Sequence, residues 1–222
     1  MAEASLPRIL YKYYPPERLD VFENCSVRFT HPVKFNDAFD SNWAAIDKKH
    51  RADIFQFRNT LGIFCLTGDA DNHLMWVHYA AQHTGFVIGF NTADSLFSDD
   101  GGKLQRVKYT APPSGIRPPS IALCLYKDRD WSYEKEWRCI RPINSGQSRD
   151  IFLPPTALDE IVLGSKMSRD HITSVLEFVD LLKPDFNVTV SVSKLDIASK
   201  AISHAVSSLS LCPNCRGAGH IR

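Results

Sequence analysis

The sequence predicts a mixed α+β fold, because strand-like runs and helical patterns both occur along the chain. Short apolar or alternating runs bounded by Pro, Gly, Asn and Asp indicate strands. Capping residues followed by apolar side chains at helical spacing indicate helices. The 222 residues are 44% hydrophobic and 23% charged, which fits one medium-sized domain with a real core and leaves disordered, collagenous and coiled-coil classes without support.

The first elements are read from aromatic and alternating runs. An aromatic run over residues 9–14, stopped by Pro15 and Pro16, predicts the first strand. A short helix is predicted over 17–24, and the alternation over 26–30 predicts a second strand. The segment 35–40 is dense in Asn and Asp, so it is predicted to be a loop anchored by phenylalanines.

The middle of the chain predicts a strand, a helix and a strand. A continuous apolar run over 61–66 predicts a buried strand. Asp71 or Asn72 can cap the aromatic-rich helix that follows, and Gly85 is predicted to terminate it. The run over 86–90 predicts the next strand.

The second half begins with two strand predictions and ends with a strand, helix, strand pattern. Strands are predicted over 104–109 and, from its alternating rhythm, within 131–143. A strand over 161–163 is followed by a helix capped by Ser168 and by a strand over 188–192. We therefore predict a single α+β domain over residues 1–197.

Residues 198–222 are predicted to be a tail outside the core, with a Cys-x-x-Cys motif at Cys212 and Cys215. Two thiolates at this spacing can occupy two corners of a tetrahedral zinc site. Tail histidines or a second chain would have to complete it. The alternative is an unstructured tail with two free thiols.

Charge and hydropathy restrict the location and the partners. Lys and Arg number 26 against 25 Asp and Glu, so the net charge of +1 supplies no overall field for nucleic acid or anionic lipid. The first ten residues show no basic segment followed by an apolar run of signal-peptide length, and no window approaches the length of a membrane span. The other cysteines stand alone in apolar stretches, as reduced cysteines do. We therefore predict a cytoplasmic protein without a membrane partner.

Polar side chains gather at four places, and a catalytic site would require some of them to converge. The four are Lys12 with its neighbouring tyrosines, Asn36 and Asp37 with Asp40, Trp76 with His78 and Tyr79, and the segment from Lys127 to Arg138. His78 has no metal-ligating partner at helical spacing, which favours a hydrogen-bonded core or rim histidine. Phosphate-loop, nucleophile-elbow and zinc-protease motifs do not occur in the sequence.

Glu134-x-Glu136 is the strongest chemical signal. In a strand, side chains two residues apart point the same way, so both carboxylates are predicted on one face. Like charges this close disfavour full ionisation and invite a cation or a shared proton. The alternative is a solvated strand face, balanced by Lys135 and Arg138.

Six sequence blocks follow one another over roughly residues 8–195: Leu10-Tyr11-Lys12-Tyr13, Phe35-Asn36-Asp37-Ala38-Phe39-Asp40, Phe64-Cys65-Leu66-Thr67, Met75-Trp76-Val77-His78-Tyr79-Ala80, His83-Thr84-Gly85-Phe86 and Trp131-Ser132-Tyr133-Glu134-Lys135-Glu136-Trp137-Arg138. In this order they resemble the microbial domain-of-unknown-function family 2971, which carries no settled activity. The chain departs from this family at Ala38, where the family usually has Pro.

The order of Lys12, Thr67 and Glu134-x-Glu136 also resembles that of functional residues in ADP-ribosyltransferase folds. The resemblance implies a mostly antiparallel split sheet flanked by helices, with NAD as substrate. In such chemistry nicotinamide leaves as a neutral ring and the ribose becomes oxocarbenium-like, so a nearby carboxylate stabilises positive charge. Lys12 departs from the pattern, since these enzymes usually have Arg or His there.

The resemblance assigns roles to individual residues. Glu136 would be the carboxylate beside the ribose, Glu134 would orient an acceptor, and Lys12 would hold phosphate or ribose. The predicted substrate-binding residues are Tyr13, Asn36, Asp37, Thr67, Trp76, His78, Tyr79 and Arg138, with Trp76 or Tyr79 stacking on nicotinamide.

The function that follows is an ADP-ribosyltransferase or NAD glycohydrolase, with an unidentified acceptor and a role in toxicity or defence by analogy of fold. There are two alternatives. One is a non-catalytic interaction module, and the other is a metal-independent nuclease or other hydrolase using Glu136 and His78.

Overall fold

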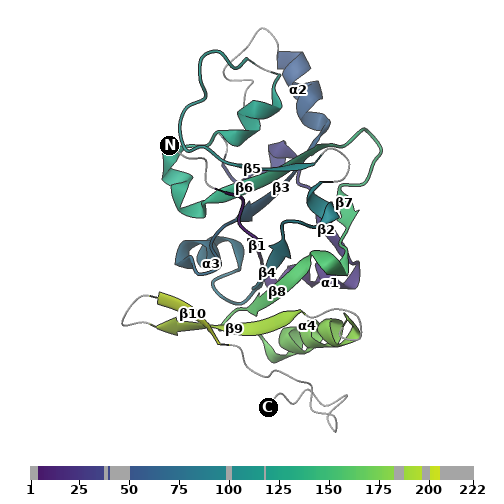
Figure 1. Cartoon of the computed structure of the whole chain (residues 1–222), viewed down its shortest axis with the longest axis vertical. Helices are drawn as coiled ribbons and strands as arrows, with labels where there is room; N and C mark the ends of the chain where they lie inside the picture. Colours follow the sequence, from purple (N-terminus) through teal and green to yellow (C-terminus); the bar gives the residue numbers. More distant parts are fainter. Residues whose placement is uncertain are drawn as a thin grey trace. The chain divides into compact units, whose positions relative to one another are not determined.

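The computed structural model describes residues 5–37, 40, 51–98, 102–117, 119–182, 188–196 and 201–205. The chain forms two compact units, each assembled from separate stretches of sequence (Figure 1). Unit 1 comprises Met1–Ser26, Asp69–Asp94 and Phe152–Arg222, and unit 2 comprises Val27–Gly68 and Ser95–Ile151.

Unit 1 contains a sheet with the strand order β10-β9-β8-β4-β1. Its strands are β1 (Ile9–Tyr14), β4 (Phe86–Asn91), β8 (Leu158–Leu163), β9 (Thr189–Asp196) and β10 (Ala201–Ala205). The β1–β4, β4–β8 and β9–β10 pairs are antiparallel, and β8 and β9 are parallel. The residues of β4 from Phe86 to Phe90 are all buried, as a central strand requires.

Unit 1 also contains α-helices and 3-10 helices. They are η1 (Pro16–Leu19), α1 (Asp20–Glu23), α3 (His73–Tyr79), η8 (Pro155–Ala157) and α4 (Arg169–Leu182). The predicted cap of α3 is Asn72, whose side chain accepts hydrogen bonds from the amides of Leu74 and Met75. Ser168 caps α4 by accepting from the amide of His171 at 3.3 Å. The α4 crossover between β8 and β9 allows these two strands to be parallel.

The sequence predicts that Gly85 terminates α3, and this prediction is wrong. The helix ends at Tyr79, and Ala81, Gln82 and His83 follow with φ values of 45°, 56° and 71°. Gly85 instead allows the chain to pass close to β1, because a Cβ on it would collide with the carbonyl oxygen of Tyr14.

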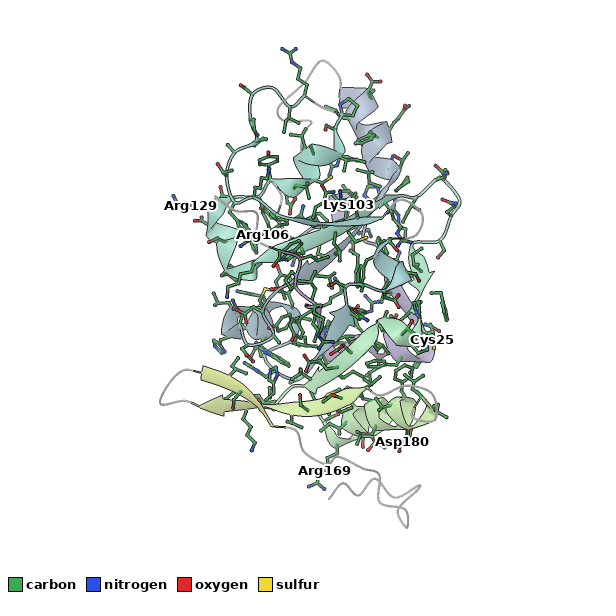
Figure 2. The ribbon with its side chains drawn as sticks, in the orientation of Figure 1. Cys25, Lys103, Arg106, Arg129, Arg169 and Asp180 are labelled. Carbon is green, nitrogen blue, oxygen red and sulfur yellow. The ribbon has the colours of Figure 1, made fainter. Side chains whose placement is uncertain are left out.

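Unit 2 contains three antiparallel strands in the order β3-β6-β5. They are β3 (Leu61–Thr67), β6 (Glu136–Pro142) and β5 (Lys103–Arg106), and Figure 2 labels Lys103 and Arg106 at the two ends of β5. Two further strands, β2 (Ser26–Arg28) and β7 (Asp150–Phe152), form a separate two-stranded sheet.

One α-helix and several 3-10 helices surround these strands. They are α2 (Arg51–Asn59), η2 (Pro32–Lys34), η4 (Ser95–Phe97), η6 (Ile121–Leu125) and η7 (Arg129–Glu134). One hydrophobic cluster in the core of the unit consists of Ile54, Leu61, Ile63, Leu123, Cys124 and Ile140. The helix α2 was not predicted, because its stripe is short: Ile54 is buried and Phe57 packs against the same cluster, whereas Phe55 is 61% exposed.

The strand predicted within 131–143 begins only at Glu136. Asp128 accepts a hydrogen bond from the amide of Asp130 at 2.9 Å and so starts the 3-10 helix η7, which extends to Glu134. Lys135 then takes the left-handed conformation, with φ at 46°. The residues whose alternation predicted one strand thus belong to two elements, the 3-10 helix η7 and the strand β6.

The mixed α+β class with mostly antiparallel pairing is confirmed. No helix within the described ranges has the length and apolarity needed to span a membrane. The strand β10 lies in the stretch predicted as tail, where it pairs with β9. Cys212 and Cys215, the predicted zinc ligands, lie outside the described residues.

Candidate functional site: a buried ion network beside a pocket

Two of the four predicted polar clusters converge in unit 2. The charged side chains of Asp40, Lys127, Glu134, Glu136 and Arg138 form one network, and each is at most 7% exposed. Charged groups are rarely buried to this extent unless they are paired. The network is therefore the most distinctive polar feature in the described part of unit 2.

Local structure explains why these side chains meet. Glu136 and Arg138 are two residues apart on β6, so their side chains share one face of the strand. Glu134 is the last residue of η7, immediately before the left-handed Lys135. Lys127 is held next to this face because its amide donates to the carbonyl of Lys108 at 3.1 Å.

The guanidinium of Arg138 is at the centre of the network. Its Nε and Nη2 donate to the two carboxylate oxygens of Glu136, at 2.7 and 2.9 Å. Nη1 donates to Asp40 Oδ1 at 3.0 Å and to the carbonyl of Cys124 at 2.6 Å, and Nη2 also donates to Asp40 Oδ2. Every N–H of the guanidinium thus has an acceptor, which a lysine ammonium could not reproduce.

Lys127 connects the remaining carboxylates. Its Nζ donates to Glu134 Oε2 at 2.6 Å and to Glu136 Oε2 at 3.3 Å, and lies 3.8 Å from Asp40 Oδ2. The same ammonium lies 4.7 Å from the ring centroid of Trp131, a cation–π distance. The cation that two neighbouring glutamates were predicted to attract is therefore a side chain of the protein itself.

Pairing keeps these groups charged. Burial alone would raise the pKa of Glu136, but Arg138 and Lys127 outweigh it and lower the pKa to about 2. Burial would lower the pKa of Lys127, yet Glu136 and Glu134 raise it above its ordinary value. Neither group is poised to exchange a proton near neutral pH, so both are fixed charges rather than acid–base catalysts.

A cavity of about 520 Å³ adjoins the network in unit 2. Its lining consists of Asp37, Asp40, Tyr109, Thr110, Ala111, Pro112, Tyr126, Lys127, Asp128 and Arg129. Asp40 and Lys127 therefore belong both to the lining and to the ion network. Arg129 is exposed, and Figure 2 shows its side chain pointing away from the ribbon. The volume is that of a small-molecule site.

The hydroxyl of Tyr109 connects the cavity to β6. It accepts a hydrogen bond from the backbone amide of Glu136 at 2.6 Å. Burial raises the pKa of Tyr109; the hydrogen bond from Glu136 acts in the opposite direction, while the carboxylates of Glu136 and Glu134 raise it further. Tyr109 is therefore a neutral phenol in the cavity wall.

The structure corrects the alternative of a solvated strand face at Glu134-x-Glu136. Both glutamates are buried, at 3% and 4% exposure, and Glu134 lies in η7 rather than in the strand. The partners shown here are Lys127 and Arg138, while Lys135 is exposed. Neither glutamate is among the residues that line the cavity, and both reach it through their hydrogen bonds with Lys127, which does line it.

Thr67 also lies in unit 2, where it pairs with Glu136 in the β3–β6 register and is 1% exposed. Asp37 lines the cavity, whereas the neighbouring Asn36 is exposed and is not part of the lining. Of the predicted substrate-binding residues, the structure thus brings Thr67, Asp37 and Arg138 to this region of unit 2.

The other two polar clusters converge in unit 1. The Tyr13 ring meets the Trp76 ring edge to face, with centroids 5.4 Å apart, and its hydroxyl donates to the carbonyl of Asp69 at 2.9 Å. Trp76 is fully buried and stacks on His83. His78 is exposed, with its ring 6.4 Å from that of Tyr79, and Lys12 Nζ lies 5.8 Å from the Tyr14 ring centroid.

Sequence reasoning missed two contributors to the site, Tyr109 and the carbonyl of Cys124. Tyr109 was visible only as the end of a predicted strand just before a proline-rich connector. A carbonyl leaves no signal in the side-chain pattern. No group of three or more His, Cys, Asp or Glu residues suited to hold a metal ion occurs in the described part of the chain.

Comparison with protein families gives one match for this chain. Residues 75–118 match the family of proteins of unknown function DUF2971. The resemblance predicted over roughly residues 8–195 is thereby confirmed for this segment. The matched segment includes α3 from Met75 onward, β4, β5 and Tyr109. Comparison with curated proteins and with solved structures gave no significant match.

Proposed function

We propose that unit 2 binds NAD in the cavity beside Lys127 and cleaves its nicotinamide–ribose bond, as an NAD glycohydrolase or an ADP-ribosyltransferase. The observation that carries this proposal is a cavity of about 520 Å³ whose wall is fixed by the buried ion network. A wall of charges that are already oriented stabilises a developing charge without having to reorganise.

The charge of the lining suits the proposed reaction. Aspartates outnumber cations among the lining residues, with Asp37, Asp40 and Asp128 against Lys127 and Arg129. The nicotinamide ring is cationic in NAD, and the ribose becomes cationic as the ring leaves. Carboxylates in the wall favour both species, whereas Arg129, whose side chain is exposed, is suited to the phosphates.

The proposed step balances as follows. The bond between ribose C1′ and the nicotinamide nitrogen breaks, and its electron pair leaves with the ring, which becomes neutral. The oxygen of water, or of an acceptor group, then forms a bond to C1′ and loses its proton to solvent. Asp37 is our candidate for the carboxylate beside the ribose, because it is half-buried and lines the cavity.

Glu136 receives a different role in this proposal from the one suggested by the resemblance. Its carboxylate is engaged by Arg138 and Lys127 and lies behind the cavity wall. We therefore propose that Glu136 is a positioning residue, which orients Arg138 and Lys127. Lys12 belongs to unit 1, so the proposed site is built without it.

Nicotinamide release from NAD by the purified full chain tests the proposal. We expect release by the wild type and a loss of roughly 100-fold or more in Asp37→Asn, which keeps the size of the side chain and removes its charge. Asp150→Asn is the matched control, since this carboxylate in unit 2 is exposed and pairs with Arg28. No release by the wild type and no heat of NAD binding would overturn the proposal.

A second candidate is a binding module without catalysis. Its supporting observation is that both glutamates of the Glu134-x-Glu136 motif are engaged by cations of the protein. NAD binding by calorimetry without any nicotinamide release would favour this candidate over the enzyme.

A further inference from the structure

The hydroxyl of Tyr109 differs from the other polar groups of the cavity wall in how its hydrogen bonds are used. A backbone N–H can only donate, so the 2.6 Å contact with the amide of Glu136 makes the phenol oxygen the acceptor. The proton of the hydroxyl must then point elsewhere. Among the described residues, no side chain or carbonyl accepts it, and Tyr109 lines the cavity.

Lys127 offers a contrast within the same wall. Its ammonium already donates to Glu134 and Glu136 and contacts the ring of Trp131. A ligand would therefore have to compete with carboxylates for this cation. The hydroxyl of Tyr109 can donate without any such competition.

The backbone fixes the position of Tyr109. The amide of Val107 donates to the carbonyl of Glu136 at 2.9 Å, and the amide of Lys108 donates to the carbonyl of Leu125 at 2.7 Å. The segment before Tyr109 is thus held on both sides by backbone hydrogen bonds. A donor placed this firmly can discriminate between ligands, because little ordering is needed on binding.

We propose that the Tyr109 hydroxyl is a specificity-determining hydrogen-bond donor of the cavity and that it binds the neutral carboxamide oxygen of a nicotinamide ring. The inference rests on the proposed function, since it names the part of NAD that contacts this wall. A neutral acceptor fits better than a carboxylate, because Asp37, Asp40 and Asp128 line the same cavity. A ligand carboxylate would meet three lining carboxylates against two lining cations, Lys127 and Arg129, and Lys127 is already paired with Glu134 and Glu136.

Binding of two probes to the full chain tests this inference by calorimetry. The probes are NAD and its deamidated form, which carries a carboxylate in place of the carboxamide. We expect the wild type to bind NAD roughly tenfold more tightly than the deamidated form. In Tyr109→Phe the affinity for NAD should fall by roughly five- to tenfold, and the affinity for the deamidated form should change less.

Tyr11→Phe is the matched control, because it also removes a hydrogen-bonded phenol hydroxyl, and Tyr11 belongs to unit 1 and is not among the residues that line the cavity. We expect it to bind both probes as the wild type does. A merely structural role of Tyr109 would weaken both probes equally in Tyr109→Phe, and this result would overturn the inference. If Tyr109→Phe does not fold, the inference is judged by the wild type alone, from the ratio of its affinities for NAD and for the deamidated form.

The possible failures are distinguishable. If the wild type binds neither probe, the proposed function fails and this inference fails with it. If the wild type binds both probes equally, or if Tyr109→Phe and Tyr11→Phe behave alike, NAD binding in the cavity stands and the role of Tyr109 is wrong.

Discussion

In unit 2, side chains from three separate segments are joined by ion pairs. In unit 1, by contrast, the side chains that meet are aromatic rings in contact with one another. Arg138 joins Asp40 and Glu136, while Tyr13, Trp76 and His83 contact one another through their ring faces and edges. The pKa shifts follow this difference. Pairing lowers the pKa of Glu136 to about 2, but burial lowers the pKa of His83 and raises that of Tyr13.

The comparison teaches that burial alone does not decide the charge of a side chain. Buried groups with opposite charges beside them stay ionised, and buried groups without such partners stay neutral. Unit 2 can therefore present fixed charges to a ligand. The rings of Trp76 and His83 contribute packing to unit 1, with centroids 5.2 Å apart and planes inclined by 7°.

The largest expected effect is that of removing the central guanidinium. Arg138→Met keeps much of the side-chain volume but leaves Asp40 and Glu136 buried with fewer partners. We expect the free energy of unfolding, measured by urea titration, to fall by about 3 to 5 kcal/mol.

Arg28→Met is the control for that variant. Arg28 pairs with Asp150 at 2.9 Å, but both side chains are about half exposed. We expect this change to cost less than about 1 kcal/mol. Equal losses in the two variants would show that the buried network adds nothing beyond an ordinary surface ion pair.

Acid should weaken unit 2 through Glu136. Because its pKa is about 2 in the folded chain and 4.5 as an ordinary carboxyl, the unfolded state binds more protons between these values. The stabilising contribution is therefore fully present above about pH 5 and is lost as the pH falls through 4.5 towards 2. Its size is about 3 kcal/mol.

Urea titrations between pH 6 and about pH 2 measure this loss. Glu136→Gln should be less stable than the wild type at neutral pH and should show a flatter pH dependence below pH 5. Parallel pH profiles for the two proteins would mean that Glu136 does not have its lowered pKa in the folded chain.

Trp76→Phe examines the ring cluster of unit 1. The change removes the hydrogen bond from Trp76 Nε1 to the carbonyl of Ala70, 2.9 Å long, and part of the stack on His83. We expect a loss of about 1 to 2 kcal/mol of unfolding free energy. NAD binding should not change, because the proposed cavity is in unit 2. A large loss of NAD affinity in a folded variant would return Trp76 to the role of a nicotinamide-stacking residue.

The sequence carried enough information for most strands and for the caps of the longer helices. Alternation and apolar runs identified β1, β3, β4 and β8, and Asn72 and Ser168 were read as capping candidates. These signals are local, since they depend on neighbouring residues only. The helix α2 was missed because its core-facing stripe is short, with Ile54 and Phe57 on the core and Phe55 exposed.

The site was only partly predictable, because its geometry depends on residues far apart in sequence. Glu134-x-Glu136 indicated that a cation was needed, but the pattern could not show that Lys127 supplies it or that Asp40 contacts Arg138. Asp40 and Arg138 are separated by 98 positions. The left-handed Lys135 breaks the strand rhythm, so the face of Glu134 could not be derived from alternation.

The smallest expected effect is the loss of unfolding free energy in Tyr11→Phe, which is compared with the loss in Tyr109→Phe, so that one tyrosine from each unit is tested. The Tyr11 hydroxyl donates to Glu160 Oε1 at 2.8 Å, and both residues are half-buried. In Tyr11→Phe, water can replace the lost donor, so we expect a cost of about 0.5 to 1 kcal/mol of unfolding free energy. In Tyr109→Phe the amide of Glu136 loses its acceptor at a more buried position, which raises the expected cost to about 1 to 3 kcal/mol.

Thermal unfolding of the two variants side by side measures the difference. A larger loss in Tyr11→Phe would mean that the Glu136 amide finds another acceptor, and that the phenol of Tyr109 is not tied to β6 as its 2.6 Å contact indicates.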